Sequence, residues 1–177
     1  MKKFLPILLL AFVSLFIFSC DDNSNDNPTY QDNDTYSQMR DVTGTFNAAN
    51  SYAFTQGINI QSTDVVLVYR FLGDSWQLIP KMMYLPNATG MPTNREFQYN
   101  FVFSSQNVQI SVDDENFNLS TGLTSAEATQ YLTNQKFRIV LVPASSGKTN
   151  IDYNDYNAVV KYYNLDESKV IETKVSK

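Results

Sequence analysis

Histidine is absent from this chain of 177 residues, and cysteine occurs only once, at Cys20. Without histidine, the familiar serine, cysteine and zinc-dependent catalytic constellations lack a required side chain. A single cysteine excludes a disulfide within the chain, so an apolar core must stabilise the fold. The remaining candidates for site chemistry are carboxylates, tyrosines, lysines and arginines. No cofactor or metal ion is expected.

Basic residues are scarce, with 13 Lys and Arg against 18 Asp and Glu. A nucleic-acid-binding protein carries a basic face, and a protein that binds anionic lipid through charge carries a cluster of lysines. The sequence contains neither feature. We therefore expect no nucleic-acid partner and no electrostatic attachment to a membrane surface.

The first nineteen residues predict a signal peptide. Lys2 and Lys3 precede an apolar run at residues 4–18 that contains Pro6. A membrane-spanning helix needs about 20 apolar residues, so this shorter run is more typical of a secretory signal that is removed.

Cys20 follows this apolar run directly. The pattern Ile17-Phe18-Ser19-Cys20 resembles the lipobox of bacterial lipoproteins, in which the cysteine is acylated after the leader. Phe18 departs from the pattern because a smaller residue is usual at that position. The alternative is an ordinary signal peptide with a chance cysteine. Two or more acyl chains would anchor the protein on a membrane without any spanning helix.

Residues 20–39 predict an Asn/Asp-rich tether between the anchor and the folded domain. This segment is rich in Asp, Asn, Ser and Thr and has few apolar side chains, so it cannot offset the entropy of ordering. We expect it to be disordered. Residues 40–177 then form a single β-rich domain, because their length and apolar content suit one core.

Period-two alternation of apolar residues dominates the predicted domain. It is clearest at residues 96–113, where Phe97, Tyr99, Phe101 and Phe103 share one strand face and are expected in the core. Residues 104–107 favour a turn, so the segment predicts a β-hairpin. Residues 64–72 and 136–144 are apolar on both faces, which is typical of central strands.

Weaker strands are expected at residues 41–48, 51–60 and 76–85. Pro80 interrupts the third of these, so we expect an edge or a bend there. Gly73-Asp74 predicts the turn before it. Capping signals at Thr124 and Asp155 predict two short helices. The fold class is therefore all-β: an antiparallel β-sandwich with one or two short peripheral helices, with a jelly roll or barrel as the alternative.

Five segments in order carry a resemblance to a known group of proteins. They are DVVLVYRF, DSWQLIP, FQYNFVFSSQNVQISVDD, NQKFRIVLVPA and DYNAVVKYYNLD, which span most of residues 64–166. Together they resemble a group of small lipoproteins from the Bacteroidetes lineage. Some of its members carry a collagen-like stretch after the lipid cysteine, where this chain has the tether. The resemblance transfers no activity to any residue.

Asp21 and Asp22 follow the cysteine directly. In lipoproteins of the same lineage, acidic residues at this place resemble an export signal to the outer leaflet of the outer membrane. The resemblance thus implies a cell-surface lipoprotein. The alternative is that Asp21 and Asp22 simply begin a solvated linker.

Asp113, Asp114 and Glu115 form the best acidic cluster for catalysis. Paired carboxylates can hydrolyse glycosides or bind calcium. However, adjacent strand residues point to opposite faces, and a solvated turn is the commoner role of such a run. We expect no catalytic residue here.

Arg70 and Arg138 interrupt two otherwise apolar central strands. If these strands pair, the two guanidinium groups would emerge together and clamp a carboxylate or phosphate. The alternative is that each reaches solvent or meets an acid such as Asp64 or Glu96. Trp76 is a further candidate for binding, because aromatic rings stack on sugars.

Exposed tyrosines would extend such a binding patch, and the candidates are Tyr84, Tyr99, Tyr153, Tyr156 and Tyr162. The sequence thus favours a lipid-anchored envelope protein that binds a glycan or an envelope protein without catalysis. A glycan-directed hydrolase that uses carboxylates and a purely structural envelope protein are the alternatives.

Overall fold

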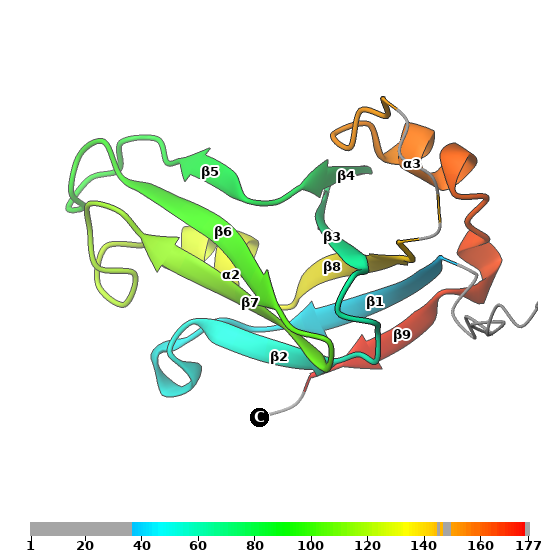
Figure 1. The fold of residues 1–177 in the computed structure, drawn as a ribbon. Coiled ribbons are helices and arrows are strands. Elements are labelled where there is room, and N and C mark those ends of the chain that lie inside the picture. The colour runs from blue at the N-terminus through cyan, green and yellow to red at the C-terminus, as the bar shows by residue number, and fades with distance from the viewer. Residues whose placement is uncertain (1–36, 145, 147–149, 176–177) are drawn as a thin grey trace, which may run out of the picture. The chain divides into compact units, whose positions relative to one another are not determined.

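The computed structural model describes residues 37–144, 146 and 150–175, which all lie in one compact unit, Asp34–Lys177 (Figure 1). The first strand, β1, begins at Gln38, inside the segment predicted as the tether. Met39 is buried, at 6% exposure. The folded region therefore begins slightly earlier than the sequence predicts.

In the described part of the chain, nine strands form two sheets, called A and B below. Sheet A has the order β4-β3-β8-β1-β9, and sheet B has the order β2-β7-β6-β5. The strands of sheet A are β1 (Gln38–Gly44), β3 (Val65–Leu72), β4 (Ser75–Leu78), β8 (Gln135–Val142) and β9 (Ile171–Lys174). Those of sheet B are β2 (Ala53–Gly57), β5 (Lys81–Tyr84), β6 (Glu96–Phe103) and β7 (Asn107–Asp114). All neighbours pair antiparallel except β1 and β9, which are parallel.

The two sheets face each other across the larger apolar cluster, which confirms the predicted β-sandwich. Sheet A contributes Val68 and Phe137, and sheet B contributes Phe97 and Ile110, all fully buried. Phe46 fills the space between the sheets, with its ring centroid 5.0 Å from Phe54 and 5.9 Å from Phe137. Each such side chain contributes about 1.5–3 kcal/mol through the removal of apolar surface from water.

The other face of sheet A is covered by α3 (Tyr156–Tyr162) and the chain that follows it (Figure 1). Val159 and Leu165 pack there against Leu67 and Val140 from β3 and β8. These two strands are therefore buried on both faces, as their continuous apolar sequences predict.

The chain passes from sheet A to sheet B between β4 and β5. Pro80 lies between these two strands, each of which is an edge strand of its sheet. The missing amide donor thus costs no ladder hydrogen bond. This confirms the edge or bend expected for residues 76–85.

Both predicted helix starts are confirmed. Thr124 and Glu127 form a reciprocal capping box at the start of α2 (Ser125–Leu132), and Asp155 accepts a hydrogen bond from the amide of Ala158 in α3. The hairpin of β6 and β7 and the turn at Gly73, with φ +68°, are also confirmed.

Two sequence expectations need correction. The strand expected at residues 41–48 ends at Gly44, because Asn47 caps a short 3-10 helix, η1 (Ala48–Asn50). On β6, Phe97 and Tyr99 are fully buried, but Phe103 is 47% exposed. Phe103 is the last residue of β6 and adjoins the hairpin turn, so the apolar face of this strand continues beyond the buried core.

Candidate functional site: the cleft between β4 and α3

Arg138 is the centre of a buried charge cluster on the face of sheet A that α3 covers. It lies on the central strand β8, opposite Asp41 of β1 and Tyr69 of β3. The side chain of Arg138 is only 8% exposed. Its Nε and Nη2 donate to the two carboxylate oxygens of Asp41 at 2.6 and 2.9 Å. This bidentate geometry is the strongest form of such a pair.

The same guanidinium group also holds the C-terminal part of the chain. Its Nη1 donates to Glu167 of the 3-10 helix η2 (Glu167–Lys169) at 2.6 Å and to the hydroxyl of Tyr156. The Tyr156 hydroxyl in turn donates to Glu167 at 2.7 Å. Arg138 thus fixes α3 and η2 against sheet A.

The protonation states in this cluster follow from its contacts. Burial by itself lowers the pKa of Arg138, but hydrogen bonds with Asp41 and Tyr156 outweigh it, and the pKa lies above its ordinary value. Burial, assisted by the hydrogen bond to Glu167, raises the pKa of Tyr156 to about 12. At neutral pH, Arg138 is therefore charged and Tyr156 keeps its proton.

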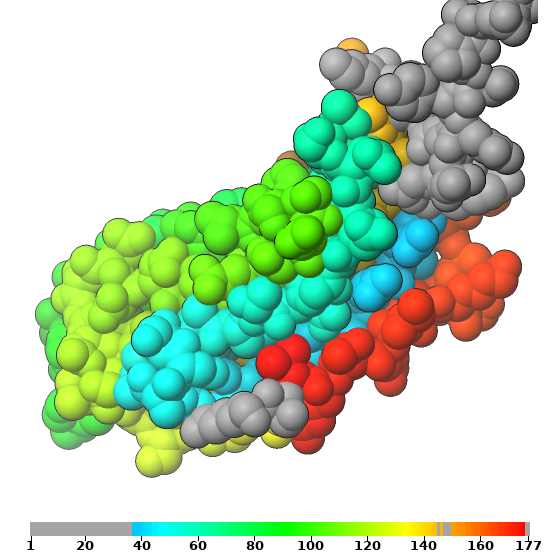
Figure 2. Space-filling view, turned by 60° about the horizontal axis from the view of Figure 1, so that its bottom comes forward, coloured from blue at the N-terminus to red at the C-terminus, as the bar shows by residue number. Residues whose placement is uncertain are grey.

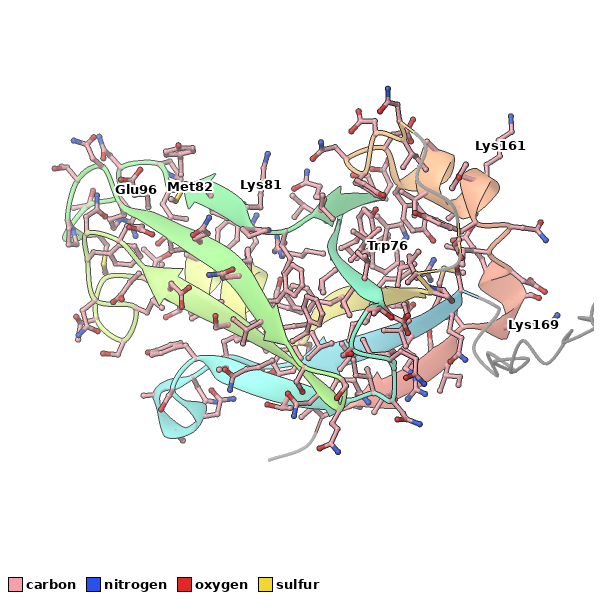
Figure 3. The ribbon with its side chains drawn as sticks, viewed as in Figure 1. Trp76, Lys81, Met82, Glu96, Lys161 and Lys169 are labelled. Carbon is pink, nitrogen blue, oxygen red and sulfur yellow. The ribbon has the colours of Figure 1, made fainter. Side chains whose placement is uncertain are left out.

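Trp76 lies over this cluster and is half-buried. The guanidinium carbon of Arg138 is 4.3 Å from the centroid of the Trp76 ring, a cation–π contact. The ring centroids of Phe71 and Tyr156 are 4.9 and 5.8 Å from that of Trp76. In Figure 3, Trp76 is seen on the side of sheet A nearest α3. These contacts hold the indole ring in a fixed orientation.

A cleft of about 350 Å³ opens beside Trp76, between β4 and the start of α3. It is lined by Asp74, Ser75, Trp76, Asn154, Asp155, Tyr156, Asn157 and Glu167. These side chains supply carboxylate acceptors, amide donors and acceptors, and an aromatic surface, but no lysine or arginine. Such a cleft can bind a polyhydroxylated ligand through hydrogen bonds and ring stacking.

Arg70 does not join Arg138, although their strands are neighbours. In the register of β3 and β8, Arg70 lies opposite Phe137 and Arg138 lies opposite Tyr69, so the two guanidinium groups are on opposite faces of sheet A. The expectation that they emerge together is wrong, because their positions differ by one residue in register. Both are buried, at 3% and 7% exposure, so neither reaches solvent.

The acids named as possible partners of these arginines have other roles. Asp64 accepts hydrogen bonds from the amides of Gln61 and Ala144, and no ion pair joins Glu96 to either arginine among the described residues. The observed partners Asp41 and Glu167 were missed by the sequence reasoning. Alternation gave no clear signal for Asp41, because Met39 is apolar but Thr43 on the same strand face is polar.

Arg70 lies in the core between the sheets without a carboxylate partner in the described part of the chain. Its Nε and Nη2 donate to Gln135 at 3.2 and 2.7 Å, and its guanidinium carbon is 4.4 Å from the ring centroid of Tyr99. Its Nη1 has no hydrogen-bond partner there. Burial therefore lowers the pKa of Arg70.

The other candidate residues from the sequence do not gather into one site. Asp113, Asp114 and Glu115 are exposed at the end of β7, and none of them lines the cleft beside Trp76. The five tyrosines differ in environment: Tyr84 is 74% exposed, Tyr153 and Tyr162 are partly exposed, and Tyr99 and Tyr156 are buried. Only Tyr156 lines the cleft.

A second buried ion pair, Arg95 with Glu127, lies at the opposite end of the sandwich. Arg95 is fully buried and donates to both oxygens of Glu127 at 2.7 and 2.8 Å. It also donates to the carbonyl oxygens of Gly122 and Pro86, both at 2.7 Å. The hydrogen bond with Arg95 lowers the pKa of Glu127 to about 2. These contacts join the β5–β6 connection to the β7–α2 connection and to helix α2, so the pair is structural.

Two larger hollows have no aromatic side chain among the described residues of their lining. One of about 750 Å³ lies between the start of β1 and β9. Another of about 390 Å³ runs beside β9. Within the described ranges, no group of His, Cys, Asp and Glu side chains is arranged to hold a metal ion.

Comparison with protein families, with curated proteins and with solved structures found no match. In the part of the chain that the structure describes, no helix is both long and apolar enough to cross a membrane. The predicted signal peptide, the lipid attachment residue Cys20 and the predicted export residues Asp21 and Asp22 lie outside the described residues.

Proposed function

We propose that this chain is a lipid-anchored protein of the cell envelope, in which acylated Cys20 and the tether display the β-sandwich at the surface of the outer membrane. The lipobox-like sequence at Cys20 and the acidic pair Asp21-Asp22 support this location. The sandwich is a noncatalytic binding module. We assign it no catalytic step.

The ligand is a glycan bound in the cleft beside Trp76. The observation that carries this assignment is the lining of the cleft, which combines an indole ring with two asparagines and three carboxylates. Sugar hydroxyls both donate and accept hydrogen bonds, and sugar rings stack on aromatic side chains. Because three carboxylates and no lysine or arginine line the cleft, a glycan rich in uronic acid or sulfate would be repelled. The preferred ligand is a neutral or amino-substituted oligosaccharide.

Trp76 gives a direct test because it is the only tryptophan in the chain. Titration with neutral or amino oligosaccharides is expected to change its fluorescence in a saturable manner, whereas oligosaccharides of uronic acids should leave it unchanged. A change confined to the acidic sugars, or no change across the panel, would rule out the proposed ligand class.

Two matched variants test whether the oligosaccharide binds in the cleft or makes nonspecific contacts with exposed aromatic rings. Asn157→Ala removes an exposed amide from the cleft lining and is expected to weaken oligosaccharide binding about fivefold, since one lost hydrogen bond accounts for roughly 1 kcal/mol. Tyr84→Ala removes a highly exposed aromatic ring from β5 in the other sheet and should leave binding unchanged.

The anchor has its own test. Cells grown with a fatty-acid analogue should label the wild-type protein but not Cys20→Ala. Protease treatment of intact cells should then remove the labelled domain. Absence of labelling would refute the lipid anchor, and labelling without proteolysis would place the domain on the periplasmic side.

A further inference from the structure

Strand β9 is an edge of sheet A. Among the described residues it pairs only with β1, and all four of its residues, Ile171–Lys174, are exposed. Figure 2 shows the end of this red strand along the margin of the face in view. An open edge of this kind presents backbone donors and acceptors that can pair with another strand.

The backbone groups that face outward can be identified from one hydrogen bond. The amide of Val175 donates to the carbonyl oxygen of Thr43 in β1 at 3.0 Å. Because successive residues of a strand alternate in direction, the backbone groups of Thr173 also face β1. Those of Glu172 and Lys174 then face away from the sheet.

The sequence of this strand is complementary to itself. When two copies are aligned antiparallel about Thr173, Glu172 lies opposite Lys174 and Ile171 lies opposite Val175. Opposite charges, apolar pairs and paired threonines all stabilise antiparallel neighbours. The other edge strands, β2, β4 and β5, contain at most one charged residue each, so they offer no such charge pairing.

We propose that β9 pairs antiparallel with β9 of a second copy of this chain, about a two-fold axis at Thr173, so that the two copies share one continuous sheet. The outward backbone groups of Glu172 and Lys174 form the new hydrogen bonds. Glu172 already contacts Lys136 at 3.1 Å, and its exposed carboxylate also meets Lys174 of the partner. The contact is short, so it is weak between free molecules and is strengthened when both copies are held on one membrane.

Cysteine crosslinking of the full chain in cells tests this register. At the non-hydrogen-bonded centre of such a pair, the two Cα atoms are about 4.5 Å apart, within the range of a disulfide. Thr173→Cys is therefore expected to give an oxidised dimer on a nonreducing gel. Thr55→Cys, an exposed threonine on the edge strand β2, is the matched control and should remain monomeric. The unsubstituted chain controls for Cys20.

Reversing the charge of Glu172 or Lys174 tests whether these two residues determine how the two copies of β9 pair. In the Thr173→Cys background, Glu172→Lys or Lys174→Glu places like charges opposite each other and should lower the crosslinked fraction about tenfold. Coexpression of these two variants, with tags of different mass, should restore crosslinking as the mixed dimer. A melting temperature close to that of the Thr173→Cys parent confirms that each variant is folded. Absence of a dimer in the Thr173→Cys variant, equal crosslinking at position 55, or insensitivity to charge would each overturn the proposal.

Discussion

Arg70 and Arg138 lie on adjacent strands of sheet A, yet their guanidinium groups are on opposite faces of that sheet. Within the described ranges, Arg138 meets the carboxylates of Asp41 and Glu167, whereas Arg70 meets only the amide oxygen of Gln135 and aromatic rings. Removal of a buried cation that has carboxylate partners should destabilise the fold more than removal of a buried cation that has none, because it leaves the carboxylates uncompensated.

Replacement of each arginine by methionine is expected to have unequal effects. Arg138→Met leaves the 2% exposed Asp41 with Lys136 as its remaining cation, and should lower the free energy of unfolding by about 3 kcal/mol. Arg70→Met replaces a buried cation that has no carboxylate partner among the described residues, and should change stability by less than about 1 kcal/mol. Urea denaturation measures both. Equal losses would contradict the different roles assigned to the two arginines.

The pair Arg95 and Glu127 predicts a specific dependence on pH. The folded-state pKa of Glu127 is about 2, below the ordinary value of 4.5. Its contribution to stability is therefore complete above about pH 4.5 and is lost as the pH falls towards 2. Glu127→Gln leaves the buried Arg95 without a negative partner and should cost about 3 kcal/mol at pH 7.

Urea denaturation at several pH values measures this dependence. The difference between the wild type and Glu127→Gln should narrow as the pH falls from 4.5 to 2, since protonation then removes the same charge from the wild type. Glu115→Gln, a change at an exposed site, should stay within about 0.5 kcal/mol of the wild type at pH 7. A constant difference between the wild type and Glu127→Gln across this range would contradict the assigned ion pair.

Gly44 is the last residue of β1 and Gly57 is the last residue of β2. Replacing each of them by alanine tests the packing between the sheets. A Cβ atom at Gly44 would lie 2.4 Å from the Phe54 ring, which is held inside the core, whereas a Cβ atom at Gly57 would meet nothing within 4 Å. Gly44→Ala should therefore cost about 1–3 kcal/mol through overpacking. Gly57→Ala should be neutral or stabilise the protein by less than about 1 kcal/mol. Thermal unfolding measures the stability of the two variants. Similar melting temperatures would contradict the predicted difference between Gly44→Ala and Gly57→Ala.

The strands of this protein were predicted where the sequence carries a strong periodic pattern. The alternation in β6 and β7 and the apolar runs in β3 and β8 reveal both the hairpin and the central strands. Strand β9 was not predicted. Its sequence has only four residues, of which two are charged, and it is a strand because β1 supplies a partner that lies far from it in the chain.

The candidate site was predicted only in part for a similar reason. Arg138 and Trp76 are visible in the sequence as unusual residues in apolar strands. Their environment depends on pairings across long separations, since Asp41 is 97 residues from Arg138 and Glu167 belongs to a short 3-10 helix that was not predicted. Sequence periodicity gives the face on which a side chain lies, but not the distant segment that covers that face.

Strand β6 provides a test of where the core ends. Phe97 is fully buried between the sheets, whereas Phe103 on the same strand face is 47% exposed and stacks on Phe101 with ring centroids 6.3 Å apart. Phe97→Ala should lower the free energy of unfolding by about 3–5 kcal/mol, because it creates a cavity in the core. Phe103→Ala should cost only about 1–2 kcal/mol, because about half of its surface is already exposed. Chemical denaturation of the two variants measures this difference, and a loss at Phe103 as large as that at Phe97 would show that the core extends to the hairpin turn.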